Sequence, residues 1–512
     1  MCIRDSSQGG GHWHEDGSKE GQPFPLKNLH AHKLGSFGVL LTKEKTRYES
    51  TLYFQRDGYP ARRPWYPFSN NIYQEIIPAA ADGYPYPIKA LFLHKGTPVY
   101  ASPAGHAMIE ALSDPRVIPL VIGCDIVIAE STMYCDYIFP DTSIWERWGT
   151  PHITPAINCA VSKVRQPMVD PIVEKVTVFG REMPISMEAV MLAIAERLGL
   201  AGYGPDGFGS GMDFACPEDY YLKMVANIAF GDKPNLEDAV PEADDAELEL
   251  FRRARRHLPP AVFDEARWRQ ALGNDESLWR RVVYVLNRGG RFEDFSKAYK
   301  GDKLGHTFKG QFNFFVEPVA QGRNSLTGEP FSGLPIYEPV KEADGAVVSD
   351  DGFEFHLITF KEIVGGQSRT PGNYWSQGAL LPGGNSVLMN RLDVLRLGLK
   401  DGDRVRLVSA TNPEGVWDLG NGQKVEIAGP VKEVEGMRPG TVAVSWHYGH
   451  WAYGAGDFEV DGVRVPGDPR RAVGLCANAV MRLDTKLGNV CLTDPIGASA
   501  SFYDTRVRVE RA

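Results

Sequence analysis

The stretch Phe355-His356-Leu357-Ile358-Thr359 opens the part of the chain that decides the fold. It is followed by several short runs rich in β-branched and apolar residues, which Gly, Asp and Pro turns separate from one another. Several of these runs alternate apolar with polar residues, as strands with one buried face do. They lie at residues 404–408, 423–427, 441–444 and 506–509. We therefore expect residues 351–512 to close into a barrel of about six or seven strands.

Residues 86–235 show the alternation of strand and helix that is typical of a parallel sheet. Ala90-Leu91-Phe92-Leu93-His94 is a short apolar run, and Ser102-Pro103 then offers an N-cap and a first-turn proline for a helix. A second apolar run follows at residues 117–122. Strand, helix and strand in this order form a βαβ unit, so an α/β fold is predicted here.

A longer helix is predicted at residues 186–199, with Ser186 as its N-cap and Gly199 as its stop. We expect its apolar stripe to pack on the parallel sheet. The stripe consists of Met187, Met191, Ile194 and Leu198.

The rest of the chain divides into connecting segments. Residues 1–6 open no recognisable element, and we interpret them as a sequencing or assembly scar on a chain that starts within a longer protein. Residues 7–85 are rich in Gly, Pro and aromatic residues and are expected to form an irregular connection. Residues 236–350 are predicted to be helical and irregular, with the domain linker in the acidic stretch at 344–352.

Composition excludes several classes of protein. A formal net charge of -10 and a pI near 5.7 argue against a nucleic-acid surface, because phosphate binding needs clustered Lys and Arg. No apolar run approaches the roughly 20 residues that span a bilayer. The seven cysteines form no Cys-x-x-Cys pair, which argues against a zinc or iron-sulfur site within the chain. They are Cys2, Cys124, Cys135, Cys159, Cys216, Cys476 and Cys491.

Five motifs of the C-terminal region occur in an informative order. They are Gly365-Gly366-Gln367-Ser368-Arg369-Thr370-Pro371-Gly372-Asn373, Met389-Asn390-Arg391-Leu392-Asp393, Leu397-Gly398-Leu399-Lys400-Asp401-Gly402-Asp403-Arg404-Val405, Trp446-His447-Tyr448-Gly449-His450-Trp451 and Asp504-Thr505-Arg506-Val507-Arg508-Val509. In this order they resemble the C-terminal dinucleotide-binding barrel of the molybdopterin oxidoreductases, the dimethyl-sulfoxide-reductase family. The resemblance implies a Rossmann-like parallel-sheet region followed by a double-psi β-barrel.

The resemblance also implies a cofactor and a reaction. The cofactor would be molybdenum bis(molybdopterin guanine dinucleotide), with a [4Fe-4S] cluster and the molybdenum ligand in a part upstream of this chain and no metal ligand within it. The chain is most similar to members that reduce tetrathionate to thiosulfate in anaerobic respiration, with the arsenate reductases as near relatives. Arsenate, arsenite, thiosulfate and polysulfide are the alternative substrates.

Partners and location follow from the same resemblance. Electrons would come from a membrane quinol-oxidising subunit through an iron-sulfur subunit, which would transfer them to molybdenum, and the enzyme would be periplasmic. The substrate would be a small inorganic oxyanion or sulfur compound. The alternative from another class of protein is a non-catalytic cofactor-binding or structural subunit. It explains the lack of a cysteine-rich cluster motif as well as an upstream cluster does.

The segment from Thr359 to Asn373 is the main candidate for cofactor binding. Its glycines allow close backbone approach, and its polar side chains suit an anionic ligand rich in hydrogen-bonding groups. A surface loop with turn chemistry is the alternative interpretation. In the family the corresponding loop wraps the pterin and its phosphates, which implies binding roles for Thr359, Lys361, Gln367, Ser368 and Arg369.

His447 and His450 are candidates at the substrate funnel. Two histidines alone are a weak signal for a metal, and an aromatic loop packed on the barrel is an equally good interpretation. The resemblance places this loop near the pterin, where His447 or His450 would hydrogen-bond the cofactor or an oxyanion substrate.

The remaining candidates lie at strand ends and near the C-terminus. Asp125 follows a predicted strand, where a carboxylate accepts hydrogen bonds from a ribose or a guanine edge; a turn cap is the alternative. By resemblance Arg147 would approach the nucleotide, while Asp136, Pro140 and Glu146 hold the local fold, and Asn478 and Tyr503 would touch the second dinucleotide. Asp401-Gly402-Asp403 is predicted to be a structural turn that feeds a strand.

Overall fold

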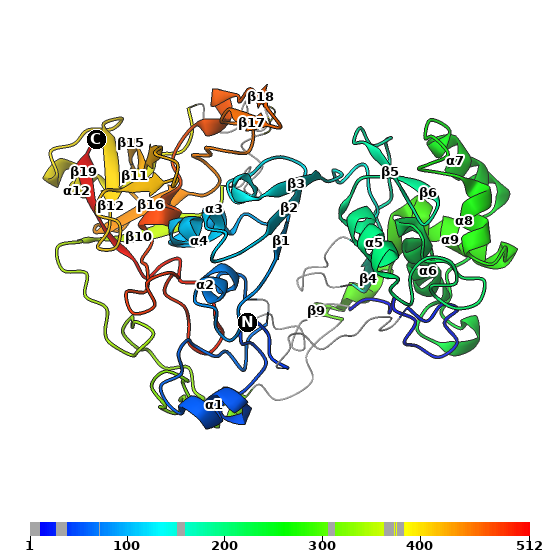
Figure 1. Ribbon diagram of the computed structural model, residues 1–512, viewed down its shortest axis with the longest axis horizontal. Coiled ribbons are helices and arrows are strands. Elements are labelled where there is room, and N and C mark those ends of the chain that lie inside the picture. The colour runs from blue at the N-terminus through cyan, green and yellow to red at the C-terminus, as the bar shows by residue number, and fades with distance from the viewer. Residues whose placement is uncertain are drawn as a thin grey trace. The chain divides into compact units, whose positions relative to one another are not determined.

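The computed structural model describes residues 11–26, 38–70, 72–150, 159–305, 313–362, 373, 375 and 383–512. Contacts divide the chain into two compact units, whose elements are labelled in Figure 1. Unit 1 comprises Met1–His32 and Phe139–Phe312, and unit 2 comprises Lys33–Ile138 and Asn313–Ala512. This division does not follow the predicted boundaries, because each unit combines two separate stretches of sequence. The predicted linker at residues 344–352 lies inside unit 2.

A closed barrel of six strands forms the centre of unit 2, with the order β10-β16-β11-β15-β12-β19. β10 pairs in parallel with β16 and antiparallel with β19. Alternate residues of the strands, such as Phe355 and Leu357, are fully buried. The barrel predicted from the alternating runs is therefore confirmed. Its strands are β10 (Phe355–Phe360), β11 (Val387–Met389), β12 (Arg404–Val408), β15 (Ala428–Glu433), β16 (Thr441–Ser445) and β19 (Arg506–Arg511).

In the described residues of unit 2, two hairpins lie outside the barrel ladder. β13 (Val416–Asp418) pairs with β14 (Lys424–Glu426), and β17 (Phe458–Val460) pairs with β18 (Val463–Val465). The run at residues 423–427, expected among the barrel strands, falls largely in the first hairpin. A short turn after β13 lets this run pair with β13 instead of with a barrel strand.

A parallel pair of strands confirms the predicted βαβ unit. β1 (Leu91–His94) and β2 (Val121–Asp125) are parallel, and β3 (Tyr137–Pro140) follows at the point where the chain passes from unit 2 into unit 1. The helical connection between the first two strands is broken into α3 (Pro98–Ala101), a turn of 3-10 helix and α4 (Ile109–Ser113). The predicted helix start at Ser102-Pro103 was wrong, because Ser102 is the C-cap of α3. The second strand begins later than predicted, after Pro119, which lacks the N–H that a ladder requires. Unit 2 also contains α1 (Leu52–Asp57), α2 (Ile76–Ala81), α10 (Glu317–Ala320) and α12 (Arg391–Arg396).

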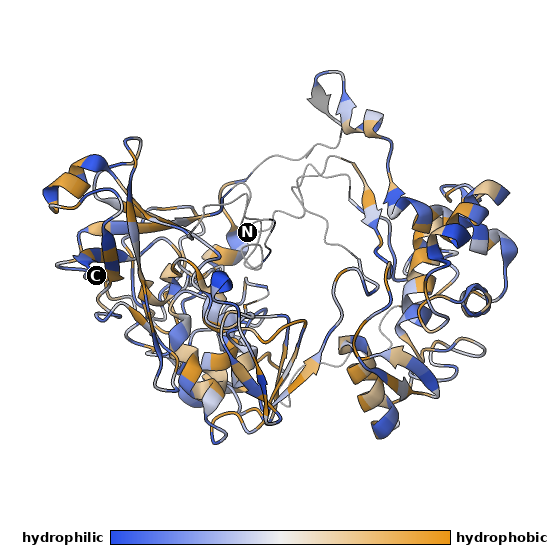
Figure 2. Cartoon of the chain, turned by 90° about the horizontal axis from the view of Figure 1, so that it is seen from above, coloured by the Kyte–Doolittle hydropathy of each residue, from blue (hydrophilic) through white to orange (hydrophobic). Residues whose placement is uncertain are grey.

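Unit 1 is built mainly from helices. Asp244, Asp264 and Asp275 each cap a helix by accepting a hydrogen bond from a first-turn backbone N–H. Figure 2 shows orange and blue residues interspersed along these helices. Helix α7 buries Leu248 and Phe251, and α9 buries Trp279, Val282, Val283, Val285 and Leu286, which accords with the helical character predicted for residues 237–288. None of the helices in the described parts is long and apolar enough to cross a bilayer. The elements are β4 (Val161–Lys163), β5 (Lys175–Val178), β6 (Arg181–Pro184), α5 (Met187–Leu198), α6 (Pro217–Phe230), α7 (Asp245–Arg255), α8 (Glu265–Ala271), α9 (Glu276–Arg288), β7 (Gly290–Phe292), β8 (Tyr299–Lys300) and β9 (Lys303–Leu304).

Helix α5 has the predicted ends, but the prediction of its buried face was wrong. Ser186 accepts a hydrogen bond from the Ala189 N–H, and Gly199 ends the helix in the left-handed conformation. The residues that α5 buries, Ala189, Leu192 and Ala195, lie on another face than the predicted stripe. Met191, Ile194 and Leu198 are exposed. The smaller side chains allow α5 to pack closely on the β5–β6 hairpin, in a cluster with Val178 and Met183.

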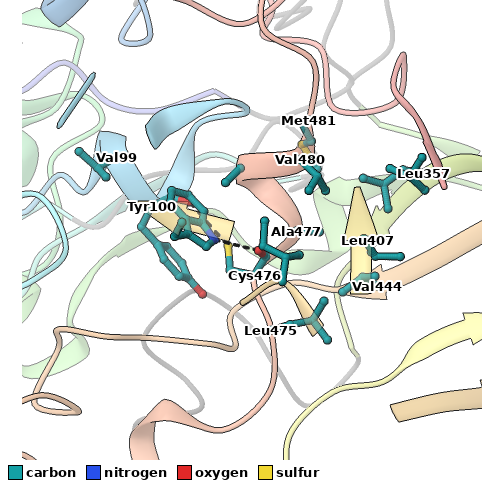
Figure 3. Packing of buried hydrophobic residues seen from close by; sticks show 14 of the residues in the cluster. Val99, Tyr100, Leu357, Leu407, Val444, Leu475, Cys476, Ala477, Val480 and Met481 are labelled. Atoms are coloured by element: carbon teal, nitrogen blue, oxygen red, sulfur yellow. Dashed lines mark hydrogen bonds between the residues drawn. The ribbon is translucent and has the colours of Figure 1, made fainter. Parts of the chain in front are cut away.

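The parallel-sheet region and the barrel share one hydrophobic core in unit 2. Figure 3 shows Val99 and Tyr100 near Cys476 and Ala477, with the barrel residues Leu407 and Val444 in the same cluster. The indole of Trp417 is buried there, and its Nε1 donates to the Cys476 carbonyl at 3.0 Å. The core therefore fixes the region after β1 against the barrel.

A buried ion cluster stabilises the N-terminal part of unit 2. The Glu75 carboxylate accepts hydrogen bonds from Lys43 Nζ at 2.8 Å and from two nitrogens of Arg63 at 2.8 Å. All three side chains are almost fully buried. Arg63 also donates to Asn489 at 2.9 Å and pairs with Asp82. The cluster thus joins the irregular N-terminal stretch to the C-terminal region.

Candidate functional site

The candidate site lies where the parallel strands β10 and β16 end. Their register pairs Thr359 with Val444 and Phe360 with Ser445, and the Trp446 N–H donates to the Phe360 carbonyl at 2.9 Å. Because the two strands run in the same direction, the residues that follow them emerge together. Lys361 therefore lies close to Trp446, with its Nζ 5.7 Å from the centroid of the indole ring.

Three buried polar atoms at these strand ends have no hydrogen-bond partner among the described residues. They are Thr359 Oγ1, Trp446 Nε1 and His447 Nε2. Buried polar atoms in native proteins are nearly always bonded, so these three atoms are positioned to bond a ligand or a residue outside the described ranges. The indole Nε1–H can only donate, and the Lys361 ammonium beside it adds a positive charge. The group therefore suits a ligand with anionic or carbonyl oxygens.

His447 is held in an unusual conformation. Its φ is 82°, in the left-handed region that side chains other than glycine seldom adopt. Burial, together with the charge of Lys361, lowers the pKa of His447 to about 4. The imidazole is therefore neutral at neutral pH, and its tautomer decides whether Nε2 donates or accepts.

Tyr448 connects the same loop to the residue after Lys361. Its hydroxyl donates to Glu362 Oε2 at 2.9 Å. Burial and the Glu362 carboxylate raise the pKa of Tyr448, so the phenol keeps its proton. The loop after β16 is thus bonded to the end of β10 as well as to its own strand.

His450 belongs to a buried contact that sequence reasoning did not find. Its Nδ1 lies 2.7 Å from Glu130 Oε1, and the same oxygen accepts the Ala452 N–H at 3.3 Å. The ring stacks on Tyr100 with centroids 4.4 Å apart, and the Tyr100 hydroxyl donates to the Tyr448 carbonyl at 2.8 Å. Tyr100 follows β1 and Glu130 follows β2, so the parallel-sheet region clamps the loop after β16. The only signal for Glu130 in the sequence is an acid shortly after an apolar run.

The other predicted cofactor residues of unit 2 are dispersed. Asp125 is buried at the end of β2, and its Oδ1 accepts the Ile126 N–H at 2.7 Å, as a turn cap would. Asn478 donates to the Tyr100 carbonyl at 2.7 Å, and Tyr503 is exposed. Gln367, Ser368 and Arg369 lie outside the described residues. Cofactor binding by these residues stays a prediction.

Arg147 lies in unit 1 and is already paired. It donates to Asp141 Oδ2 at 3.0 Å and to Glu188, while its Nε is buried without a partner among the described residues. Together with Trp148 and Glu218 it lines a pocket. Asp136 and Glu146 accept backbone hydrogen bonds, at 2.8 Å from Val121 and at 2.6 Å from Ser143, which supports their predicted structural role.

The Asp401-Gly402-Asp403 motif is confirmed as a turn. Gly402 has a φ of 88°, and the Asp403 carboxylate accepts the Lys400 N–H at 3.0 Å. Asp401 accepts the Glu433 N–H at 2.8 Å. The motif therefore leads the chain into β12.

The residues at the ends of β10 and β16 fit the pterin cofactor that the sequence implies. A pyrophosphate-linked pterin needs hydrogen-bond donors, acceptors and a cation, which the Trp446 indole, the Thr359 hydroxyl and the Lys361 ammonium supply. The fit depends on the buried atoms of Thr359 and Trp446, which have no hydrogen-bond partner within the ranges that the structure describes.

Three known proteins are similar to this chain over most of its length. A selenate reductase subunit from Mesobacillus selenatarsenatis is 48% identical over 505 residues, which are 99% of this chain and 47% of that protein. A tetrathionate reductase subunit from Salmonella typhimurium is 32% identical over 491 residues, or 92% of this chain and 44% of that protein. The molybdopterin-containing subunit of the arsenate respiratory reductase from a Shewanella species is 23% identical over 448 residues, or 83% and 45%.

The chain thus spans about half the length of the curated relatives it matches. No family model matches it. The relatives nevertheless agree with the family that the five ordered motifs of the C-terminal region resemble, and on this basis the chain belongs to the molybdopterin oxidoreductase family.

Proposed function

We propose that this chain supplies the cofactor-binding barrel of a molybdenum reductase that acts on an oxyanion of selenium or sulfur. The observation that carries the proposal is the group of buried atoms of Thr359, Trp446 and His447 that find no hydrogen-bond partner in the described parts of the chain, beside the Lys361 ammonium. In this proposal the barrel is of the double-psi type, the parallel-sheet region is Rossmann-like, and the cofactor is the bis(molybdopterin guanine dinucleotide) form.

The residues of the site have separate tasks. Lys361 and the Trp446 Nε1–H bind anionic or carbonyl oxygens, and the Thr359 hydroxyl donates or accepts according to the ligand. The neutral His447 ring offers a hydrogen bond without adding charge. When bound, the molybdenum cofactor supplies the two-electron redox chemistry, while the protein supplies position and electrostatics.

Two substrates have support. The sequence motifs favour tetrathionate, whereas 48% identity over 99% of the chain to a protein named selenate reductase favours selenate. Arsenate, arsenite, thiosulfate and polysulfide are the alternative substrates that the family resemblance implies. In this proposal a membrane quinol-oxidising subunit supplies electrons through an iron-sulfur subunit, the [4Fe-4S] cluster nearest the cofactor lies outside this chain, and the enzyme is periplasmic.

The test uses a complete reductase that contains this chain. Trp446→Phe removes the Nε1 donor and keeps the aromatic ring, and Lys361→Ala removes the charge. Each should lower pterin and molybdenum content per polypeptide by about fivefold, the equivalent of a hydrogen bond worth ~1 kcal/mol. Lys424→Ala is the control, since Lys424 pairs with exposed carboxylates at the surface of the β13–β14 hairpin. Unchanged cofactor content in both site variants would exclude these residues from the cofactor site.

Substrate choice is measured separately. Oxidation of a reduced dye should be followed with selenate, tetrathionate and arsenate at equal concentrations, and the ratio of kcat/KM values identifies the substrate. A non-catalytic subunit, whether it binds the cofactor or is purely structural, would turn over none of them.

A further inference from the structure

Residues 11–14 form a fixed segment of unit 1. The Gly11 carbonyl accepts the Val161 N–H at 3.0 Å. The Ser162 hydroxyl accepts the Trp13 N–H at 2.9 Å and donates to the Trp13 carbonyl at 3.2 Å. These bonds hold the segment against strand β4, so the side chains on either side of Trp13 occupy defined positions.

The side chains on either side are two histidines, His12 and His14, whose rings lie close together. Their ring centroids are 5.7 Å apart, and the ring planes differ by 35°. Because a Zn–N bond is about 2.1 Å long, two imidazoles that share one tetrahedral ion have centroids roughly 5–6 Å apart. His12 is exposed and the His14 side chain is 39% exposed, so an ion from solvent can reach both rings. The separation of the pair is therefore compatible with a shared metal ion.

A carboxylate orients the His14 ring. Its Nδ1 lies 2.8 Å from Asp232 Oδ2, and the His14 backbone N–H donates to the other oxygen of the same carboxylate at 2.9 Å. Histidines that bind metals nearly always have a carboxylate, a backbone carbonyl or a water on the ring nitrogen that does not bind the ion. The contact therefore makes Nε2 the nitrogen of His14 that would face an ion.

Glu15 adds a second carboxylate beside the pair. Burial raises the pKa of Glu15, and the charges of His12 and His14 oppose this shift, so the carboxylate lies within electrostatic reach of both rings. A single contact between an aspartate and a histidine at a protein surface is ordinary and contributes little to stability. The second imidazole and the second carboxylate distinguish this one, because both groups are ligands of late divalent metals.

We propose that His12 and His14 bind a divalent late transition metal ion, Zn²⁺ or Cu²⁺, with Asp232 as the orienting carboxylate and water in the remaining coordination positions. The inference is independent of the proposed cofactor site, because the histidines lie in unit 1 and the proposed cofactor residues of the barrel lie in unit 2. The ion should also raise the Tm of the chain, since Asp232 joins the pair only in the folded state.

The test is a calorimetric titration of the purified, metal-free chain with Zn²⁺ and with Cu²⁺. One ion should bind with an affinity that depends on His12, and the Cu²⁺ form should show nitrogen hyperfine splitting from two imidazoles in its electron paramagnetic resonance spectrum. His12→Ala, at an exposed position, should weaken Zn²⁺ binding at least about tenfold, and Asp232→Asn should weaken it about tenfold by removing the orienting charge. The rise in Tm with Zn²⁺ should disappear in His12→Ala.

His257→Ala is the matched control, because His257 is an exposed histidine of the same unit whose Nε2 bonds the Met168 carbonyl. Its Zn²⁺ affinity should equal that of the wild type. His30-Ala31-His32 repeats the spacing of the pair outside the described residues, and the variant His30→Ala with His32→Ala should retain the ion. Unchanged affinity in both His12→Ala and Asp232→Asn would overturn the proposal, and so would loss of the ion in the His30 and His32 variant.

Discussion

The Nδ1 of His450 lies 2.7 Å from the Oε1 of Glu130, although 320 positions separate the two residues in the sequence. Both side chains are almost fully buried, and Tyr100 covers one face of the imidazole. The contact joins the loop after β2 to the loop that presents His447. It therefore determines where the candidate site stands on the barrel.

Glu130→Ala should destabilise unit 2 by about 1–3 kcal/mol, because it leaves the His450 Nδ1 and the Ala452 N–H buried without this carboxylate. Glu130→Gln keeps an acceptor oxygen and should lower the free energy of unfolding by less than Glu130→Ala does. The free energy of unfolding in urea measures both. Equal stability of Glu130→Ala and the wild type would show that the contact is not formed in solution.

Glu75→Ala should be among the most destabilising single changes in unit 2. It leaves Lys43 and Arg63 buried without their shared carboxylate, and breaking a buried pair in this way costs about 3–5 kcal/mol. Glu414→Ala, which removes an exposed partner of Lys424, should change little. Urea denaturation of the two variants under the same conditions tests the difference, and a similar loss in both would contradict the buried cluster.

Stability should rise with pH between about 4 and about 6.5. Burial lowers the pKa of His106 and of His447 from 6.5 to about 4, so in this window the unfolded chain binds protons that the folded chain does not. The stabilisation that these two histidines give is complete above pH 6.5, the pKa of the unfolded chain, and is lost as the pH falls towards 4, the pKa in the folded chain. His447→Gln should flatten the pH dependence of the unfolding free energy. The same slope in wild type and variant would mean that His447 is not buried as described.

The expressed chain should bind no iron-sulfur cluster. A [4Fe-4S] centre needs four converging thiolates, whereas the cysteines of the described residues lie in different elements. Burial raises the pKa of Cys135, Cys476 and Cys491 to about 12, which opposes the thiolate form. Iron analysis after anaerobic reconstitution should give no stoichiometric iron, and the chain alone should not reduce tetrathionate. An iron content of about four atoms per chain, which corresponds to one such cluster, would contradict this prediction.

The sequence by itself determined the local architecture. Alternating runs such as residues 404–408 specify strands, because side chains of a strand point to opposite faces and only one face is buried. Ser186 and Gly199 specify the ends of α5, because a hydroxyl satisfies first-turn N–H groups and glycine tolerates the left-handed stop. The ordered motifs of residues 365–509 identified the family. Thr359, Lys361 and His447 could also be selected from the sequence of this region.

Only the tertiary structure decided which residues meet. The apolar stripe of α5 predicted the wrong buried face, because the spacing of apolar residues does not show which element the helix packs on or how closely. Glu130 could not be selected, because its partner lies 320 positions away and a lone acid carries no periodic signal. That Thr359, Trp446 and His447 each bury a polar atom with no partner among the residues described could likewise be seen only in the folded chain. Parallel pairing of β10 with β16 places distant segments side by side, and burial is a property of the packed molecule rather than of any residue type.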